Sequence, residues 1–233
     1  MGLAHTLGKI APTPVKTWKW RRHQRRLLRT WGVEAETREF VVEHGLEVLE
    51  GPFTGLRFPE EAVRWEQASL IPCLQGTYEC ELYEHLGRPD VFIDVGSAYG
   101  FYLVGMALRG AHSYGFEIDR VRRAGSRRLA ALNGVSDRVR VSGRLRPRDL
   151  DELSLENALL LCDVEGAEKQ LFSADLVRRL HGVRIIVEFH HGSESQVTSA
   201  LRHTHNCEVV KFDGRSNEFR PADQAWGIFL PRA

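Results

Sequence analysis

The sequence is poor in cysteine. Its 233 residues hold four cysteines, at positions 73, 80, 162 and 207, and none of them forms a C-x-x-C pair. No cysteine stands at a metal-ligand spacing from a histidine, which excludes the common zinc modules. So few cysteines also exclude a disulfide-stapled scaffold. We therefore expect a protein of a reducing compartment, with a cytoplasmic location.

Long apolar runs are missing as well. No stretch approaches the roughly 18 consecutive apolar residues of a membrane-spanning helix. The start of the chain lacks the apolar segment of a secretion signal. The hydrophobic content of 42% is nevertheless ordinary for a protein that buries a core. We expect one globular domain with an appendage and no transmembrane segment.

An overall excess of one charge is absent, because 32 Lys and Arg face 31 Asp and Glu, for a net charge of +1. This balance hides a local asymmetry. Residues 16–29 hold seven Lys or Arg and no acid. Subtracting these charges leaves −6 for the remainder, so a basic segment is attached to a mildly acidic body.

The basic segment has a helical pattern. Trp20, Leu27 and Trp31 recur at helical spacing and predict a helix over 14–31 with one apolar stripe. We assign residues 1–35 to this basic helical arm. Two interpretations stay open: the tryptophans dock the arm on the body, or the arm makes peripheral contact with anionic headgroups, phosphate-bearing substrate or RNA.

Residues 36–88 predict an extension ahead of the main domain. Glu39–Glu43 and Leu46–Leu49 flank the pair His44-Gly45, which predicts a β-hairpin. A short helix follows and ends at Gly87. The segment is therefore expected to form a cap made of a hairpin and a helix.

From residue 89 to residue 233, apolar strand patterns and helical patterns alternate. This alternation predicts an α/β, Rossmann-like fold with a seven-stranded, mostly parallel sheet and helices on both faces. The last two strands have no helix between them, so we expect the last strand to be antiparallel. The expected strands are 91–95, 112–117, 138–142, 157–162, 183–189, 207–212 and 225–230.

The loop after the first strand lacks a dinucleotide fingerprint. That fingerprint, G-x-G-x-x-G, uses its second glycine to admit a pyrophosphate, and Ala98 stands at this place. Asp94 precedes the loop and would repel a pyrophosphate but attract a cationic ligand. Gly96 and Gly100 allow a sharp turn and a close ligand approach. Glu117, 21 residues after Gly96, is suitably placed to accept hydrogen bonds from both hydroxyls of a ribose.

This D-x-G-x-x-x-G pattern resembles the first motif of class I S-adenosylmethionine-dependent methyltransferases. The hexapeptide Asp-Val-Glu-Gly-Ala-Glu at 163–168 closely resembles the hallmark of FkbM-like methyltransferases. Three further stretches look like that family, at 51–55, 76–79 and 185–190. The resemblance covers about residues 46–231. It implies S-adenosylmethionine as the cofactor and O-methylation, often of a hydroxyl on a sugar, glycan or other small natural product.

Cofactor and catalytic residues are expected at the carboxyl ends of the strands. Asp163 is the candidate that faces both cofactor and acceptor, and Glu188 and His190 are its catalytic partners. His190 is the candidate base, because an imidazole titrates near about pH 6.5, and the adjacent His191 should face the opposite way. The candidates for cofactor contact are Tyr78, Glu79, Asp94, Gly96, Ser97, Ala98, Tyr99, Gly100, Glu117, Ile118 and Asp163.

Two acids near these candidates have simpler expected roles. Asp119 follows the second strand and is expected to cap the next helix. Glu168 is expected to be an exposed acid in the first turn of a helix over 166–180, where the positive end of the helix dipole favours it.

A metal-dependent mechanism competes with the imidazole base. Asp163, Glu188 and His190 could converge on a divalent cation such as Mg²⁺, which would lower the pKa of a bound hydroxyl. Their positions at strand ends permit this arrangement, and nothing in their spacing requires it.

Two further functions compete with small-molecule or glycan O-methylation. A nucleic-acid methyltransferase could use the basic arm, but no Asn/Asp-Pro-Pro-aromatic motif follows the fourth strand. The Pro72-Cys73 pair precedes the cofactor strand, whereas the nucleophile of cytosine-C5 enzymes follows it. The second alternative is a cofactor-fold binding module that has lost catalysis. It is disfavoured by the joint presence of four residues: Asp94, Glu117, Asp163 and His190.

Overall fold

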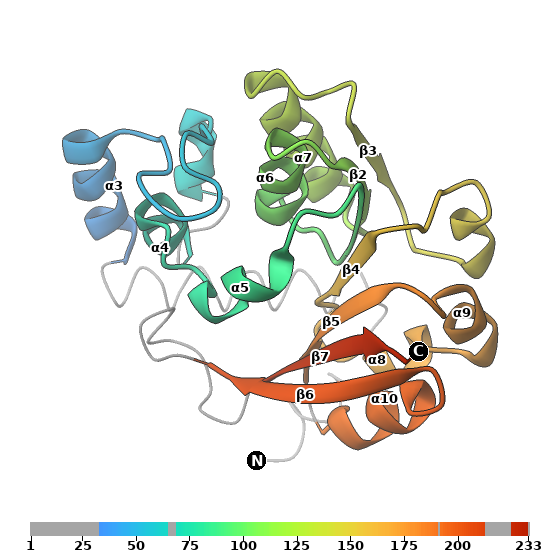
Figure 1. The fold of residues 1–233 in the computed structure, drawn as a ribbon. Helices are drawn as coiled ribbons and strands as arrows, with labels where there is room; N and C mark the ends of the chain where they lie inside the picture. Colours follow the sequence, from blue (N-terminus) through green and yellow to red (C-terminus); the bar gives the residue numbers. More distant parts are fainter. Residues whose placement is uncertain (1–32, 65–68, 191, 213–224, 233) are drawn as a thin grey trace, which may run out of the picture.

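The computed structural model describes residues 33–64, 69–190, 192–212 and 225–232. A seven-stranded sheet with the strand order β3-β2-β1-β4-β5-β7-β6 forms its centre (Figure 1). The first five strands are parallel, and β7 is antiparallel to both of its neighbours. The strands are β1 (Val91–Val95), β2 (His112–Phe116), β3 (Val139–Ser142), β4 (Ala158–Cys162), β5 (Arg184–Phe189), β6 (His205–Lys211) and β7 (Ala225–Pro231).

The predicted sheet is confirmed, including its antiparallel last strand. The predicted helix over 14–31 and His191 lie outside the described residues. Within the described part of the chain, no helix has the length and apolar character needed to cross a membrane.

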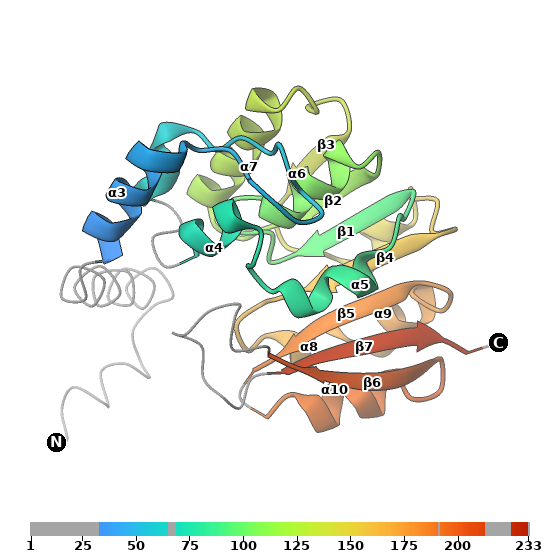
Figure 2. The ribbon, with the colours of Figure 1, turned by 60° about the vertical axis from the view of Figure 1, so that its left-hand side comes forward.

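Two helical layers cover the sheet, one on each face (Figure 2). The buried side chains of successive strand residues pack into different layers. In β1, Phe92 packs with the side of α6 and α7, whereas Ile93 packs with the side of α9 and α10. Burial on both faces explains why the central strands read as continuous apolar runs. Because side chains alternate along a strand, Asp94 lies on the same face as Phe92. The helices are α6 (Phe101–Leu108), α7 (Arg120–Leu132), α8 (Glu168–Leu171), α9 (Ala174–Arg179) and α10 (Glu194–Leu201).

The helix predicted over 166–180 is wrong in one respect, because it is broken into α8 and α9. Ser173 lies at the break and its hydroxyl accepts a hydrogen bond from the Leu176 amide at 3.4 Å. A serine in this role starts a new helix, so α9 has its own N-cap.

The predicted hairpin around His44-Gly45 is also wrong. Residues 33–44 form the helix α3 (Val33–His44), which contains the segment Glu39–Glu43. Gly45, with φ at +81°, lies directly after this helix in the left-handed conformation common at helix ends. The pattern Glu-Phe-Val-Val-Glu was misinterpreted because a short apolar run fits a helix face as well as a strand.

A hairpin-like pairing does occur, one segment further along the chain. The Val48 amide donates to the Leu56 carbonyl at 2.8 Å, and the Phe58 amide donates to the Leu46 carbonyl at 2.7 Å. The turn lies at 51–55, and Phe53 within it is buried. Glycines at both ends of this turn, Gly51 and Gly55, have φ values of +83° and +87°.

The cap shares its hydrophobic core with the sheet. Phe53 packs edge-on against Phe101 at the start of α6, with ring centroids 5.2 Å apart. Leu74 of the cap and Leu161 of β4 belong to one buried cluster. The cap is therefore held on the carboxyl ends of the strands by the same core that stabilises the sheet. Its other elements are η1 (Glu60–Arg64), α4 (Leu70–Gln75), η2 (Cys80–Leu82) and α5 (Tyr83–Leu86).

We predict that Gly105→Ala destabilises the protein, although alanine is the better helix former. A Cβ built on Gly105 would lie 2.5 Å from the Phe53 ring, so the cap would have to shift. Overpacking of this kind costs about 1–3 kcal/mol, measured as the free energy of unfolding in urea. Gly182→Ala is the matched control, because nothing lies within 4 Å of its Cβ position. Equal stability of both variants would contradict the tight Phe53–Gly105 contact.

Candidate active site

A pocket lies where the carboxyl ends of β1 and β4 meet the cap. The loop after β1 contributes residues 96–99, and α6 contributes Phe101 and Tyr102. The cap contributes Tyr78 and Glu79, and β7 contributes Trp226. The side chains of Asp94 and Asp163 also line the wall. This is the position at which parallel α/β sheets bind ligands.

The glycine loop is shaped by its protein neighbours. Gly96 has φ at +89°, and a Cβ built on it would lie 1.6 Å from the carbonyl oxygen of Asp163. Only glycine lets the loops after β1 and β4 approach this closely. Gly100 has φ at +94°, and its Cβ position faces Ser126 of α7 at 3.1 Å. The predicted turn is therefore present, but the space left by the missing Cβ atoms is filled by protein atoms.

Glu117 braces the loop from the end of β2. Its Oε2 accepts a hydrogen bond from the Ala98 amide at 3.2 Å, and its Oε1 accepts one from the Asp119 amide at 2.7 Å. Burial raises the pKa of Glu117, and the nearby Arg122 guanidinium opposes this rise. Glu117 is 5% exposed and lies behind the loop rather than in the pocket wall. The neighbouring Ile118 is an exposed apolar side chain, at 69%.

Asp119 acts as the predicted helix cap. Its Oδ1 accepts hydrogen bonds from the amides of Val121 at 2.7 Å and Arg122 at 3.3 Å, in the first turn of α7. Both side-chain acceptor bonds point into the helix, which is the geometry of an N-cap.

Three acids gather around the pocket with no basic partner in its wall. Asp94 and Glu79 are almost fully buried, at 4% and 2% exposure, and Asp163 is half-buried. Burial, followed by the charges of Asp163 and Glu117, raises the pKa of Asp94 well above its ordinary value. Among the described residues that line the pocket, none is Lys, Arg or His. Such a pocket favours a positively charged ligand, because a cation would relieve the repulsion between these carboxylates.

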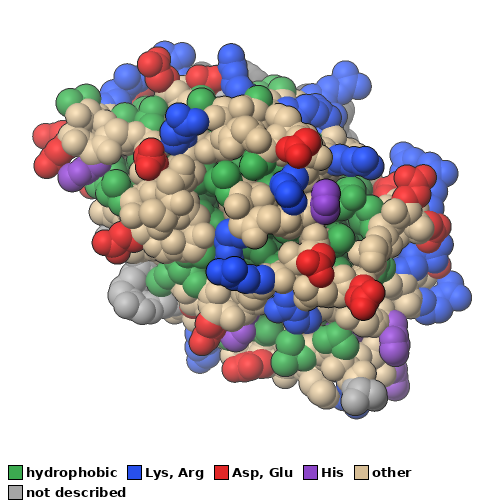
Figure 3. Space-filling model, turned by 45° about the horizontal axis from the view of Figure 1, so that its top comes forward, with side chains coloured by type: hydrophobic (Ala, Val, Ile, Leu, Met, Phe, Trp, Pro, Cys, Tyr) green, Lys and Arg blue, Asp and Glu red, His purple; other side chains and the backbone are tan. Residues whose placement is uncertain are grey.

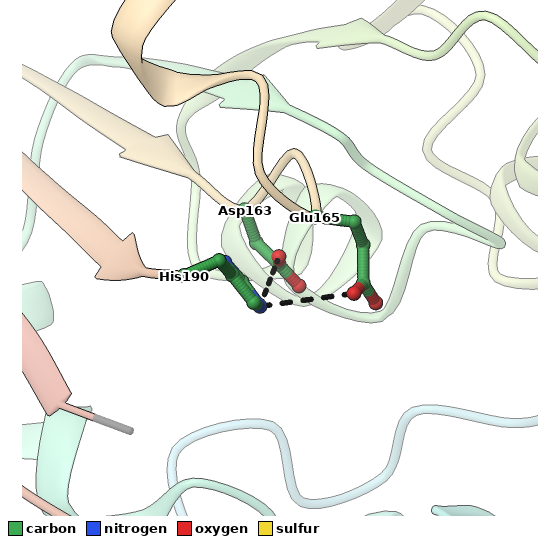
Figure 4. A group of neighbouring side chains, drawn as sticks. All are labelled: Asp163, Glu165 and His190. Atoms are coloured by element: carbon green, nitrogen blue, oxygen red, sulfur yellow. Dashed lines mark ion pairs between the residues drawn. The ribbon is translucent and has the colours of Figure 1, made fainter. Parts of the chain in front are cut away.

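A second group of acids surrounds His190 at the end of β5 (Figure 4). The Nε2 atom of His190 lies 3.8 Å from Asp163 Oδ1, 3.7 Å from Glu165 Oε2 and 3.7 Å from Glu188 Oε1. The Nδ1 atom, on the other side of the ring, is hydrogen-bonded to Glu168 Oε1 at 2.9 Å. Asp163 therefore connects this cluster to the pocket.

The charged groups in this cluster shift one another's pKa values. Burial disfavours the charged form of His190, but the hydrogen bond with Glu168 and the charges of Asp163 and Glu165 outweigh it and raise the pKa of His190. Burial, and then the charge of Glu165, raises the pKa of Asp163 to about 6. The pKa of Asp163 therefore lies close to neutral pH, where a proton-accepting group is useful in acid–base chemistry.

The expected exposure of Glu168 is wrong. Glu168 lies in the first turn of a helix, α8, but it is fully buried, at 0% exposure, instead of facing solvent. The backbone turns back at Glu165 and Gly166, which have φ values of +52° and +100°, and this turn carries Glu168 beneath His190. One feature of the sequence pointed to a role for Glu168: it is the last residue of the hexapeptide 163–168, which begins with Asp163.

The predicted metal ligands only partly converge. The three ligand atoms that lie within 4.8 Å of one another belong to Asp163, Glu165 and His190, so Glu165 takes the place expected for Glu188. Acidic groups with an imidazole are common without an ion, and this geometry does not by itself indicate a metal.

No family model matches the sequence, and no curated protein matches it. Solved structures do share its fold. The C-terminal domain of precorrin-6Y C5,15-methyltransferase from Rhodobacter capsulatus is 19% identical, with a TM-score of 0.51, covering 66% of this chain and 88% of that one. An E81Q mutant of MtNAS in complex with S-adenosylmethionine is 14% identical, with a TM-score of 0.51. The match covers 90% of this chain and 76% of that one. At these identities the likeness establishes the class I methyltransferase fold, and the likeness to the FkbM-like family stays a prediction.

We predict that Asp163→Asn stabilises the protein increasingly as the pH rises. The pKa of Asp163 is raised from 3.8 to about 6 on folding, so the folded protein holds this proton more tightly than the unfolded chain. Its contribution to stability is complete below the unfolded value and is lost as the pH rises through about 6.

The measurement is the difference in Tm between variant and wild type from about pH 4 to about pH 8. We expect the difference to grow across the middle of this range, to an equivalent of about 1–2 kcal/mol, because the half-buried carboxylate is partly screened. Asp137→Asn, at an exposed position, is the control. A difference independent of pH would show that Asp163 titrates normally.

Proposed function

We propose that this protein is an S-adenosylmethionine-dependent methyltransferase that methylates a hydroxyl group. The observation that carries this proposal is the set of three carboxylates, the buried Asp94 and Glu79 and the half-buried Asp163, around a pocket whose described wall lacks a basic side chain. S-adenosylmethionine carries a cationic sulfonium and an ammonium group, and a nicotinamide dinucleotide carries an anionic pyrophosphate. The electrostatics of the pocket favour the former.

Residues of the pocket wall, together with Glu117 and Ile118 beside it, fit the rest of this cofactor. Ser97 Oγ and Trp226 Nε1 are buried and have no hydrogen-bond partner among the described residues, so each can donate to a ligand carboxylate. Glu117 still has lone pairs for ribose hydroxyls, because each carboxylate oxygen accepts one amide. The exposed Ile118 beside it offers apolar surface for an adenine ring.

The cluster around His190 supports transfer to a hydroxyl. The cofactor supplies an activated methyl group, so the protein has to orient the acceptor and remove its proton. His190 Nε2 and the Asp163 carboxylate lie 3.8 Å apart at the edge of the pocket. The carboxylate of Asp163 can take a proton near neutral pH, because burial raises its pKa to about 6. The acceptor we propose is a hydroxyl of a sugar, glycan or other small natural product.

Cofactor binding provides the first test of this function. In calorimetry, Asp94→Asn should weaken binding of S-adenosylmethionine by about tenfold and that of the uncharged thioether product less, because only the former carries the sulfonium charge. Glu117→Ala should abolish measurable binding of both, because both contain the ribose. The exposed Asp137→Asn is the control. Unchanged affinity in Glu117→Ala would contradict the ribose role, and equal losses in Asp94→Asn would contradict the charge argument.

Methyl transfer provides the second test. Labelled cofactor is incubated with pools of hydroxylated metabolites and glycans, and products are identified by a mass increase of about 14 daltons, one CH₂. His190→Gln and Asp163→Asn should lower kcat by about 10²-fold or more while cofactor affinity changes little, since general base catalysis contributes about 10²–10⁴-fold.

A chelator separates the two mechanisms. With an imidazole base, activity persists in the presence of chelator. Loss of activity that added Mg²⁺ restores would favour a cation at Asp163, Glu165 and His190 instead.

A second candidate function, methylation of RNA, is favoured by one feature of the described residues. The segment 120–148 holds ten arginines and one acid, Asp137. Among described residues, only two of these arginines pair with carboxylates: Arg122 with Glu117 and Arg128 with Glu61. Figure 3 shows basic side chains at several points of the face that carries α6 and α7, with acidic ones between them. Arginine is suited to bidentate contacts with phosphate.

The transfer assay distinguishes this candidate. Label appearing in RNA, with binding that weakens steeply as salt increases, would favour RNA as the acceptor. Label appearing in a glycan or metabolite at a rate insensitive to salt would favour the primary proposal.

A further inference from the structure

Glu168 is a fully buried carboxylate whose one side-chain hydrogen-bond partner among the described residues is His190. Its Oε1 accepts hydrogen bonds from the Gly166 amide at 2.9 Å and from His190 Nδ1 at 2.9 Å. An ionised carboxylate at 0% exposure is costly unless hydrogen bonds and a positive charge compensate it. The burial of the Glu168 carboxylate is therefore best explained by its interaction with His190.

His190 is held from two directions. Glu168 fixes the ring through Nδ1, and Ser193 fixes the backbone, because the His190 amide donates to Ser193 Oγ at 3.1 Å. Ser193 is itself fully buried. The ring consequently has a single orientation in which Nε2 faces Asp163 and the pocket beyond it.

We propose that Glu168 is a positioning residue for His190, which accepts the Nδ1 proton and thereby leaves Nε2 as the ring atom that takes the proton of the acceptor. This inference deepens the proposed function and rests on it. Glu168 would thus affect catalysis only through His190, without touching the acceptor or the cofactor.

The proton balance of the step is complete with these groups. The acceptor oxygen forms a bond to the methyl carbon, the sulfur–carbon bond breaks, and its electron pair stays on sulfur as a neutral thioether. The hydroxyl proton moves to His190 Nε2. The ring then carries a positive charge, which Glu168 stabilises from the Nδ1 side at 2.9 Å.

The acids on the other side of the ring cannot replace Glu168. Asp163, Glu165 and Glu188 all face Nε2, at 3.7–3.8 Å, and none is paired with Nδ1. If Glu168 were removed, these carboxylates would attract a proton to Nε2, which is the tautomer that cannot act as a base at that atom. The proposal therefore predicts that a variant without Glu168 folds normally but carries the ring proton of His190 on Nε2 instead of Nδ1.

The test compares Glu168→Gln with Ser193→Ala in the full-length protein. Glu168→Gln should lower kcat by about 10²-fold or more, because an amide neither fixes the tautomer nor stabilises the charged ring, while KM and the Kd for S-adenosylmethionine change by no more than about twofold. Ser193→Ala removes another buried hydrogen bond to His190 and should change kcat far less. Equal losses in the two variants would reduce Glu168 to a structural role.

A double-mutant cycle sharpens this test. In a His190→Gln background, Glu168→Gln should have no further effect on kcat, because its role passes entirely through the imidazole. An additional loss in that background would overturn the proposal.

The ring can also be observed without any turnover. In ¹⁵N NMR of histidine-labelled protein, with the ring neutral, the His190 signals of the wild type should show the proton on Nδ1, and Glu168→Gln should move it toward Nε2. An unchanged tautomer would overturn the inference. Because this measurement needs no acceptor, it separates failure of the inference from failure of the proposed methyl transfer, which would appear as an inactive wild type with the expected tautomer.

Discussion

The contact between Gly96 and the carbonyl of Asp163 determines the geometry of the site. The amide of Asp163 is also bonded to the Val95 carbonyl at 2.9 Å, so the ends of β1 and β4 are joined on both sides of this contact. A side chain at position 96 would separate the two loops. Since Asp94 and Asp163 lie on either side of this junction, their carboxylates are forced into one pocket. The fold thus creates a like-charge repulsion at Asp94, and none of the described residues that line the pocket is basic.

Either a bound proton or a cationic ligand can relieve this repulsion. The strongly raised pKa of Asp94 favours a proton on that carboxyl in the ligand-free protein, whereas Asp163, with a pKa of about 6, is mostly ionised at neutral pH. A cation that displaces the proton binds more tightly than it would to isolated acids in water, because the pocket walls exclude solvent. Specificity for a charged sulfur compound over a neutral one would then follow from the backbone geometry at Gly96, before any shape complementarity is considered.

The sequence predicted the sheet well because the strand signals are local. Val91–Val95 holds three β-branched apolar residues and one phenylalanine, with Asp94 as its one charged residue, and no helix pattern competes with it. The misassigned elements depend on tertiary contacts instead. Glu39–Glu43 becomes helical because the following Gly45 ends a helix rather than a strand. The turn at 51–55 is held because the Phe53 ring packs directly against Gly105, which has no Cβ to block it and lies 52 positions away in the chain. Glu168 is buried because two left-handed residues, Glu165 and Gly166, reverse the chain, and glutamate rarely adopts that conformation.

Asp163 joins the two halves of the site, and this connection has an electrostatic consequence. The same carboxylate lines the acidic pocket and faces His190 Nε2 at 3.8 Å. A cation bound in the pocket competes with the imidazole for this negative charge, so it weakens one of the interactions that favour a protonated ring. Glu168, on the opposite side of the ring, keeps its hydrogen bond to Nδ1. Cofactor binding would therefore shift the protonation of His190 toward the form that accepts a proton at Nε2, without moving the ring. On the proposed function, the base becomes competent when the methyl donor is in place.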